Sequence, residues 1–265
     1  MELPVYQVDA FSSEVFKGNP AAVVPLEEWL PDDILQNIAV ENNLSETAYF
    51  VETEDGVHLR WFTPSYEVDL CGHATLASAF VYLTQLHPDK NSVTFQTNVA
   101  GDLTITKNND GFVMDLPARG GEKIDIDDIP EIVLKALGGQ KPIEAYKARD
   151  LMLVYDDASI VKNMTPDYKL LEQYPSWVCV TAKSDQENID FISRFFCADD
   201  SLLEDPVTGS AHCTLVPYWA EKFGKNTLRA YQASKRGGHL VCELKNERVF
   251  LTGQAALYLK GSIYV

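Results

Sequence analysis

The sequence lacks the glycine-rich motifs of nucleotide-binding proteins. Neither GxGxxG nor GxxxxGK[ST] occurs among its 265 residues, so a nucleotide cofactor has no support. Three isolated histidines, His58, His87 and His239, do not fall at the spacings typical of metal ligands. The sequence therefore predicts neither a cofactor nor a metal site.

Cysteines are few and do not form a recognisable pattern. Their number is odd, they are scattered along the chain, and no CxxC pair occurs. The absence of such patterns argues against a zinc ribbon and against a disulfide framework. A reducing cytoplasm is the simplest setting for the five cysteines, which are Cys71, Cys179, Cys197, Cys213 and Cys242.

Positive charge is also scarce, because 22 Lys and Arg stand against 39 Asp and Glu, for a net charge of −17. Such a balance argues against a nucleic-acid or anionic-membrane partner, both of which attract basic residues. It does not argue against a small anionic substrate, because a local group of donors can override the net field. The longest run without charge, residues 70–88, contains several polar residues, and we expect a buried helix there rather than a membrane span.

An internal repeat is the most informative feature that the sequence does have. In each half, an aromatic strand is followed by a polar loop, an acidic residue and a Gly-x-Ala sequence that opens an uncharged helix. The copies are Arg60-Trp61-Phe62 with Asp69 and Gly72-His73-Ala74, and Arg194-Phe195-Phe196 with Asp205 and Gly209-Ser210-Ala211. Glycine lets the backbone approach a ligand closely, and free N–H groups at a helix start favour an anion. Two such starts suit a small carboxylic acid.

The repeat predicts an α+β protein with two pseudo-symmetric lobes. Each half has several predicted strands and one helix without charge on any face, which apolar structure must surround. We expect each lobe to be a curved sheet or open barrel around a central helix. The linker is predicted at residues 117–121, which gives an N-terminal lobe of 1–117 and a C-terminal lobe of 118–252. The last strand, about 253–265, would join the first lobe.

Two groups of residues in the first half could carry chemistry. Glu46 begins an aromatic strand, where an apolar setting would suit it to general acid/base work, although a solvated strand-end glutamate is the alternative. Cys71 and His73 stand at a predicted helix start, where a thiol can become a nucleophile. The alternatives are a small buried cysteine and a histidine satisfied within the core.

The second half offers a loop that could direct N–H groups and hydroxyls at a ligand. Asp205 and Thr208 precede Gly209 and Ser210, although an ordinary Asp or Thr helix cap would give the same pattern. His212 and Cys213 are adjacent, so on a helix their side chains diverge by about 100° and make a poor catalytic pair. The recurrence of the pattern in both halves favours a functional role for the loop.

Taken together, these motifs resemble the PhzF-like (phenazine biosynthesis) family over nearly the whole chain. The resemblance rests on several short segments in the family's order. They are Val8-Asp9-Ala10-Phe11, Gly18-Asn19-Pro20-Ala21-Ala22-Val23, Ser45-Glu46-Thr47-Ala48, Cys71-Gly72-His73-Ala74-Thr75, Asp205-Pro206-Val207-Thr208-Gly209-Ser210-Ala211-His212, and Gln232-Ala233-Ser234 with Arg236-Gly237-Gly238.

The resemblance implies a diaminopimelate-epimerase-like fold and a cofactor-independent isomerase. Family members are commonly homodimeric and place their active site between the lobes. The best-understood member isomerises trans-2,3-dihydro-3-hydroxyanthranilate by moving a proton on the ring. By resemblance, Glu46 would be the proton-shuttling glutamate, with His73 and Asp205 as its supporting pair. The substrate-binding set would be Asn19, Gly72, Thr208, Gly209 and Ser210, together with His73.

The sequence departs from the family's relatives in one respect that bears on mechanism. Epimerases of this fold use two facing cysteines, whereas here Cys71 is matched in the second half by Asp205-Pro206. Proton transfer by one carboxylate, with Cys71 as an assistant, fits this pattern better than a two-thiol racemase. Two other hypotheses stay open at this point. The chain could be a binding or interaction protein on the same fold, or a hydrolase or transferase that depends on Cys71.

Overall fold

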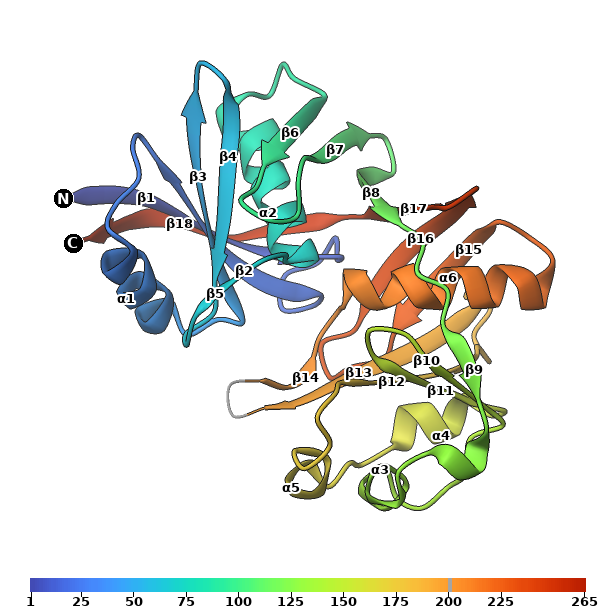
Figure 1. Cartoon of the computed structure of the whole chain (residues 1–265). Coiled ribbons are helices and arrows are strands. Elements are labelled where there is room, and N and C mark those ends of the chain that lie inside the picture. Colours follow the sequence, from blue (N-terminus) through green and yellow to red (C-terminus); the bar gives the residue numbers. More distant parts are fainter. Residues whose placement is uncertain (200–201) are drawn as a thin grey trace. The chain divides into compact units, whose positions relative to one another are not determined.

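The computed structural model describes residues 1–199 and 202–265. The chain divides into two compact units, of which unit 1 comprises Met1–Asp115 with Leu251–Val265, and unit 2 comprises Leu116–Phe250. The sequence-based boundaries at residue 117 and near residue 253 lie close to these two divisions. Each unit has its own strands and helices, which can be followed by colour in Figure 1.

Unit 1 is built on a curved, mostly antiparallel sheet. β18 and β2 flank β1, β2 runs parallel to β3, β4 is antiparallel to β3, and β6 is parallel to β4. β5 and β7 are antiparallel to β4 and β6, and β8 follows β7 as a hairpin. The strands are β1 Glu2–Ala10, β2 Asn19–Leu26, β3 Glu46–Thr53, β4 Gly56–Phe62, β5 Glu67–Val68, β6 Ser92–Gln96, β7 Leu103–Asn108, β8 Gly111–Pro117 and β18 Ala255–Tyr264.

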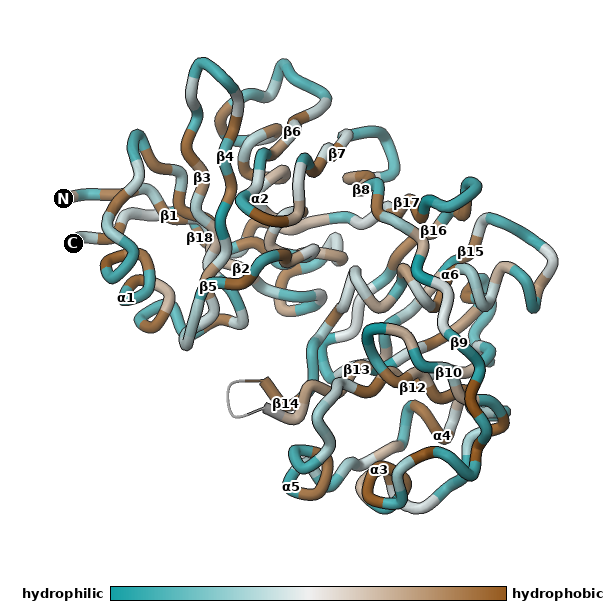
Figure 2. The backbone as a smooth tube through the Cα atoms, in the orientation of Figure 1, coloured by the Kyte–Doolittle hydropathy of each residue, from teal (hydrophilic) through white to brown (hydrophobic). Residues whose placement is uncertain are grey.

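Two helices cover the sheet of unit 1. The uncharged helix α2 (Gly72–Val81), continued by a π-helical turn (Tyr82–Leu86), packs on β1, β2 and β3. Helix α1 (Asp32–Asn42) packs on β3 and β4, where the Tyr49 hydroxyl donates to the carbonyl oxygen of Leu35 at 2.7 Å. Because helices contact β3 from two sides, this strand is an almost continuous apolar run. Figure 2 shows hydrophobic positions concentrated in strands such as β3 and β4, with hydrophilic turns.

Unit 2 repeats this strand arrangement. β10 is antiparallel to β9 and β11, β11 is parallel to β12, β13 is antiparallel to β12 and β14, β15 is parallel to β13, and β16 is antiparallel to β15. The strands are β9 Glu122–Ile124, β10 Glu144–Lys147, β11 Leu151–Tyr155, β12 Val178–Lys183, β13 Phe191–Asp199, β14 Leu202–Asp205, β15 Thr227–Gln232, β16 Gly238–Lys245 and β17 Arg248–Gly253.

The long helix of unit 2 is α6 (Gly209–Phe223), which packs on β15 and β16. Pro217 lies inside this helix and has no N–H to donate to the carbonyl four residues earlier, which belongs to Cys213. The backbone N–H of Arg119 donates to that carbonyl oxygen at 2.8 Å. Shorter helices lie elsewhere in unit 2: Ile126–Asp128 (a 3₁₀ turn), α3 Glu131–Ala136, α4 Ala158–Asn163 and α5 Tyr168–Leu171.

The order and direction of strand pairing are the same in both units. The parallel pairs β2–β3 and β4–β6 of unit 1 correspond to β11–β12 and β13–β15 of unit 2. The antiparallel hairpins β4–β5 and β13–β14 also correspond, and each leads into a Gly-x-Ala helix. This duplication confirms the pseudo-symmetric α+β fold predicted from the sequence.

The pairing register aligns individual residues of the two units. Phe62 pairs with Glu67 on β4–β5 as Phe196 pairs with Glu204 on β13–β14. Asp205 therefore aligns with Val68, one residue before the Asp69 that the sequence pattern suggested. The register matters chemically because Asp205 is buried whereas Asp69 is exposed.

Both uncharged helices predicted from the sequence are present, and α2 begins at Gly72 as α6 begins at Gly209. The pattern missed the short strands β5, β9, β10 and β14 and the short helices α4 and α5. Within residues 1–199 and 202–265, no helix is long and apolar enough to cross a membrane.

Candidate active site

Glu46 and His73 meet in unit 1. Glu46 is the first residue of β3 and pairs in register with Ala21 on β2. His73 is the second residue of α2, which packs on the same strands. The Nε2 atom of His73 lies 3.2 Å from Oε2 of Glu46, and both side chains are largely buried, with 5% and 15% of their surface exposed. The structure thus brings together two of the three predicted catalytic residues.

Helix α2 holds His73 in place because its polar side chains are satisfied internally. The Thr75 hydroxyl donates to the carbonyl oxygen of Cys71 at 2.6 Å, and the Ser78 hydroxyl donates to that of Ala74 at 2.7 Å. Such bonds to a carbonyl four residues earlier let hydroxyls lie inside an apolar environment. The helix can therefore be buried without charge, as the sequence predicted, and its first turn is fixed against the sheet.

Cys71 completes a row of three interacting side chains in unit 1. Its Sγ atom lies 3.4 Å from Nδ1 of His73, on the other side of the ring from Glu46. Burial, assisted by the charge of Glu46, raises the pKa of the Cys71 thiol to about 11, although His73 opposes the shift. At neutral pH Cys71 is therefore a thiol rather than a thiolate.

The pKa of His73 is also raised, which for a histidine favours the charged form. Burial lowers its pKa, but interactions with Cys71 and Glu46 outweigh burial and raise the pKa well above its ordinary value. A carboxyl group and an imidazole in contact in a buried setting can move a substrate proton and stabilise an anion that forms beside them.

The same three residues are the candidate metal ligands of unit 1, since their ligand atoms lie within 4.8 Å of one another. However, Cys71 faces Nδ1 of the imidazole and Glu46 faces Nε2. A metal ion takes one ring nitrogen, so an ion bound beside Cys71 would have the imidazole ring between it and Glu46. The arrangement suits proton transfer better than metal coordination.

Asn19 lies on the same side of the sheet as Glu46. It is the first residue of β2 and is fully buried. Alternate residues of a strand point to one face, so Asn19 shares a face with Ala21, whose register partner is Glu46. This position agrees with the substrate contact that the sequence suggested for Asn19.

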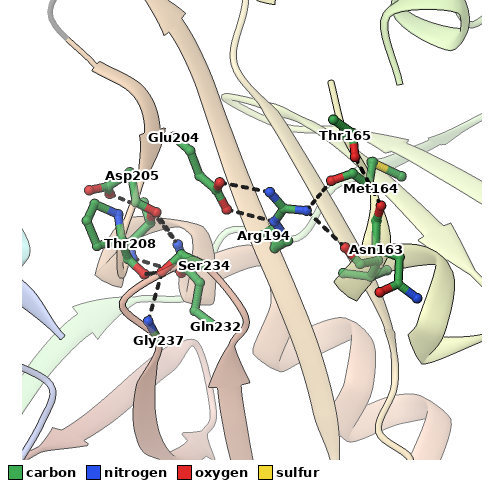
Figure 3. Close-up of polar contacts among 12 residues, drawn as sticks. Asn163, Met164, Thr165, Arg194, Glu204, Asp205, Thr208, Gln232, Ser234 and Gly237 are labelled. Atoms are coloured by element: carbon green, nitrogen blue, oxygen red, sulfur yellow. Dashed lines mark hydrogen bonds and ion pairs between the residues drawn. The ribbon is translucent and has the colours of Figure 1, made fainter. Parts of the chain in front are cut away.

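Asp205, Thr208 and Gln232 form a buried network in unit 2 (Figure 3). The Thr208 hydroxyl donates to Oδ2 of Asp205 at 2.5 Å, and the Thr208 N–H donates to Oε1 of Gln232 at 2.8 Å. The Gln232 amide in turn donates to the backbone oxygen of Asp205 at 2.8 Å. Gln232, on β15, therefore fixes the loop that links Asp205 to α6.

The turn after β15 supports the same loop. The Ser234 hydroxyl donates to the carbonyl oxygen of Pro206 at 2.8 Å and accepts from the N–H of Gly237 at 3.0 Å (Figure 3). Gln232 and Ser234 were recognised in the sequence only as part of a family motif. Their role is to hold the Asp205 loop, and the signal was their place two residues apart at the end of a predicted strand.

The starts of α2 and α6 share a further property. In the part of the chain that the structure describes, neither Cys71 nor Thr208 caps its helix with its side chain. The N–H groups of Gly72 and Gly209, the first of each helix, are the kind of donor that binds an anion at a helix start. The Thr208 hydroxyl is committed to Asp205 instead. Anion binding at these two helix starts stays a prediction from the sequence.

Arg149 is a residue near α6 that the sequence did not suggest. Its Nη2 atom donates to the Ser210 hydroxyl at 3.1 Å, and its Nε and Nη2 atoms bind Asp150 at 3.0 and 2.7 Å. The guanidinium carbon lies 5.2 Å from the centre of the Trp177 ring. A cation is therefore held beside the predicted substrate-binding Ser210, although no sequence motif marks it.

Comparison with known proteins gives a consistent match over the whole chain. The family model described as phenazine biosynthesis-like protein matches residues 8–261. An uncharacterized isomerase of Pseudomonas aeruginosa is 45% identical over 266 residues, with complete coverage of both chains. The crystal structure of a phenazine biosynthesis protein of the PhzF family from Enterococcus faecalis matches with a TM-score of 0.94 and 46% identity, again covering both chains completely.

A more distant structure shares the fold only. A hydroxyproline epimerase from Agrobacterium vitis matches with a TM-score of 0.61 at 9% identity, over 99% of this chain and 92% of that chain. The paired units described above are therefore the architecture of the epimerase fold as well.

Proposed function

Because the chain belongs to the phenazine biosynthesis-like (PhzF) family, we propose that it isomerises a small carboxylic acid by moving a proton through Glu46. The chain is an isomerase of this family, as three of its full-length relatives with 42–45% identity are named. The observation that supports the proton-transfer mechanism is the contact of 3.2 Å between Glu46 and the His73 imidazole. The family member that isomerises trans-2,3-dihydro-3-hydroxyanthranilate provides the chemical precedent.

In this proposal Glu46 removes a proton from a carbon next to an unsaturated or carbonyl group. The carbon–hydrogen bond breaks, its electron pair moves into the unsaturated system, and the proton passes to the carboxylate. The protonated Glu46 then returns the proton to another carbon on the same face of the substrate. The positive charge of His73 and the N–H groups at Gly72 stabilise the anion that forms between the two steps.

The unit 2 loop has a binding role in the proposal. The N–H groups at Gly209 and Ser210 donate to the substrate carboxylate, and the network of Asp205, Thr208 and Gln232 keeps them in position.

The homodimer that the family resemblance implies is proposed for this chain too. Light scattering on the purified protein tests this proposal, and a molar mass equal to that of a single chain would contradict the homodimer.

The protonation state of the Cys71 thiol separates the proposal from the Cys71-dependent alternative. A nucleophilic or basic cysteine must be a thiolate, and burial raises the pKa of Cys71 to about 11. Proton transfer is therefore assigned to Glu46, and Cys71 is left as a neighbour of His73.

Proton NMR in D2O tests the proposal. We expect the protein to exchange a carbon-bound proton of a substrate from a panel of cyclic hydroxy and amino acids that includes trans-2,3-dihydro-3-hydroxyanthranilate. Glu46→Gln should abolish exchange while ligand binding, followed by saturation transfer, remains. The matched control is Glu54→Gln, which makes the same change at an exposed glutamate just beyond the other end of β3. Exchange that persists in Glu46→Gln would exclude this glutamate, and binding without exchange in the wild type would favour a binding protein.

A further inference from the structure

Because the fold is duplicated, residues of unit 1 can be aligned with their counterparts in unit 2. Tyr49 pairs with Arg60 on β3–β4, and Val180 pairs with Arg194 on β12–β13. With Arg60 and Arg194 aligned, Thr47 corresponds to Val178, and the residues just before them are Glu46 and Trp177. At the helix starts, Gly72 corresponds to Gly209, and the next residues are His73 and Ser210.

The two positions that hold the proton-transfer pair in unit 1 thus hold Trp177 and Ser210 in unit 2. Arg149 contacts both of them, with 3.1 Å to the Ser210 hydroxyl and 5.2 Å to the centre of the Trp177 ring. The same place in the fold therefore carries a fixed cation and an aromatic face rather than a carboxylate and an imidazole. Neither the Arg149 guanidinium nor the Trp177 indole can shuttle a proton at neutral pH, because both keep their N–H protons.

From this correspondence we infer that Arg149 is a specificity-determining residue, which binds the carboxylate of the substrate together with Ser210. The inference rests on the proposed function, since it concerns the carboxylate of the substrate proposed there. A planar guanidinium binds carboxylates through parallel hydrogen bonds, and stacking on an aromatic ring helps to orient it. The substrate class is accordingly an unsaturated acid with a free carboxylate, rather than its amide or ester.

The contacts of Arg149 leave it able to bind a ligand. Asp150 takes Nε and Nη2, so the guanidinium is held in one orientation, and Nη1 has no partner among the described residues. About 39% of the side chain is exposed. In a chain with a net charge of −17, a cation fixed beside a helix start is an unusual local feature.

Two further arginines strengthen the positive potential here. Burial raises the pKa of the Cys213 thiol to about 11, but the charges of Arg119, Arg149 and Arg248 all act to lower it. Cys213 lies one turn beyond Gly209 on α6, so three cations act on this part of the helix.

The test compares an acid with its neutral amide in binding, and it needs no turnover. The probes are 3-hydroxyanthranilate and 3-hydroxyanthranilamide, titrated into the protein and followed by NMR. We expect the wild type to prefer the acid and Arg149→Gln to reduce that preference roughly ten- to hundredfold, the usual effect of a hydrogen bond to a charged group. Arg149→Lys should fall between them, because it keeps the charge but loses the planar fork.

Two controls separate binding from folding. Arg229→Gln makes the same charge change at an exposed arginine of unit 2 and should keep the wild-type preference. Arg149→Gln combined with Asp150→Asn leaves no unpaired carboxylate and should show the same loss as Arg149→Gln alone. The inference is overturned if the wild type does not prefer the acid, or if Arg149→Gln retains the preference.

The binding result also distinguishes the two proposals from each other. An acid preference that depends on Arg149, in a protein that shows no proton exchange, would support the inference and refute the proposed proton transfer. Proton exchange that requires Glu46, in a protein whose preference for the acid does not depend on Arg149, would support the proposed proton transfer and refute the inference.

Discussion

Arg194 and Glu204 form a two-point ion pair across β13 and β14, with Nε–Oε1 at 2.7 Å and Nη2–Oε2 at 2.8 Å (Figure 3). Nη1 of the same arginine donates to the carbonyl oxygens of Val161 and Met164, which ties the strand pair to the end of α4. Glu204 directly precedes the predicted catalytic Asp205. The pair therefore anchors the strand from which Asp205 projects.

Unit 1 contains the corresponding arrangement. Arg60 binds Glu67 through Nε and Nη2, both at 2.7 Å, and binds Asp32 of α1 through Nη1 at 2.9 Å. Both arginines stack on the phenylalanine two residues later, Phe62 at 5.1 Å and Phe196 at 4.9 Å. In each unit the arginine thus joins a hairpin to an outer helix, although only unit 2 does so through backbone oxygens.

Arg194→Gln should destabilise the protein by about 3 kcal/mol, because it leaves a mostly buried carboxylate without its partner. The partners of Arg60 are more exposed, so Arg60→Gln should cost only roughly 1 kcal/mol. Urea unfolding of the two variants beside Arg229→Gln measures this difference. Equal losses for Arg60→Gln and Arg194→Gln would contradict the argument from burial.

Gln232→Leu should destabilise unit 2 by about 1–3 kcal/mol, because the buried N–H of Thr208 loses its acceptor. We also expect proton exchange to slow, since the Asp205 loop loses the amide that bridges its two ends. Gln186→Leu, at an exposed position of unit 2, is the matched control. Unchanged unfolding and exchange in Gln232→Leu would show that the amide does not hold the loop.

Cys71→Ala should retain proton exchange within a few-fold of the wild type. The thiol is protonated at neutral pH because burial raises its pKa to about 11, so the reaction does not draw on a thiolate. Iodoacetamide should accordingly label Cys71 slowly at neutral pH. A loss of exchange larger than about a hundredfold in a folded Cys71→Ala protein would restore the thiol-dependent hypothesis.

His212 should make the protein sensitive to mild acid. Burial lowers the pKa of His212 to about 4, whereas the unfolded chain protonates it near 6.5. The folded state thus binds fewer protons in this range, so stability is fully present above pH 6.5 and declines as pH falls toward 4. The difference between these two pKa values corresponds to roughly 3 kcal/mol at most.

The difference in unfolding free energy between wild type and His212→Gln isolates this effect. Glutamine can still donate to the carbonyl oxygen of Thr208, which His212 Nδ1 contacts at 2.8 Å, but it does not titrate. The variant should lose less stability than the wild type between pH 7 and pH 4.5. His73 does not mask the result, because its raised pKa gives stability that is lost only as pH rises. Parallel pH curves for the two proteins would contradict the assignment.

The sequence was sufficient to predict the residues that belong to contiguous motifs. The start of each buried helix was identified because glycine, charge-free helices and the internal repeat are visible in the primary structure, whereas the roles of Glu46 and His73 were assigned through the family resemblance. The catalytic roles of Glu46, His73 and Asp205 stay predictions until variants are assayed. The fold class followed from the same repeat.

Arg149 and Gln232 could not be predicted in this way. Arg149 lies in the connection between β10 and β11, Gln232 ends β15 and was seen only as part of a family motif, and their partners, Ser210 and Thr208, lie more than 20 residues away. Their contacts depend on strand register, which a local pattern does not encode. The short strands β10 and β14 were missed for a related reason, since their charged residues are paired across the sheet rather than arranged by alternation.

Pro217 has a consequence for how the two copies of the repeat have diverged. The corresponding residue of α2 is Phe80, whose own N–H can complete the helical ladder, so a proline at this place belongs to the second copy alone. Because Pro217 has no N–H, the carbonyl oxygen of Cys213 can accept a hydrogen bond from the N–H of Arg119, where the chain enters unit 2. Pro217→Ala would create an internal competitor for that oxygen. The hydrogen bond that α6 lacks at Pro217 is thus replaced by a hydrogen bond that attaches the segment at Arg119 to this helix.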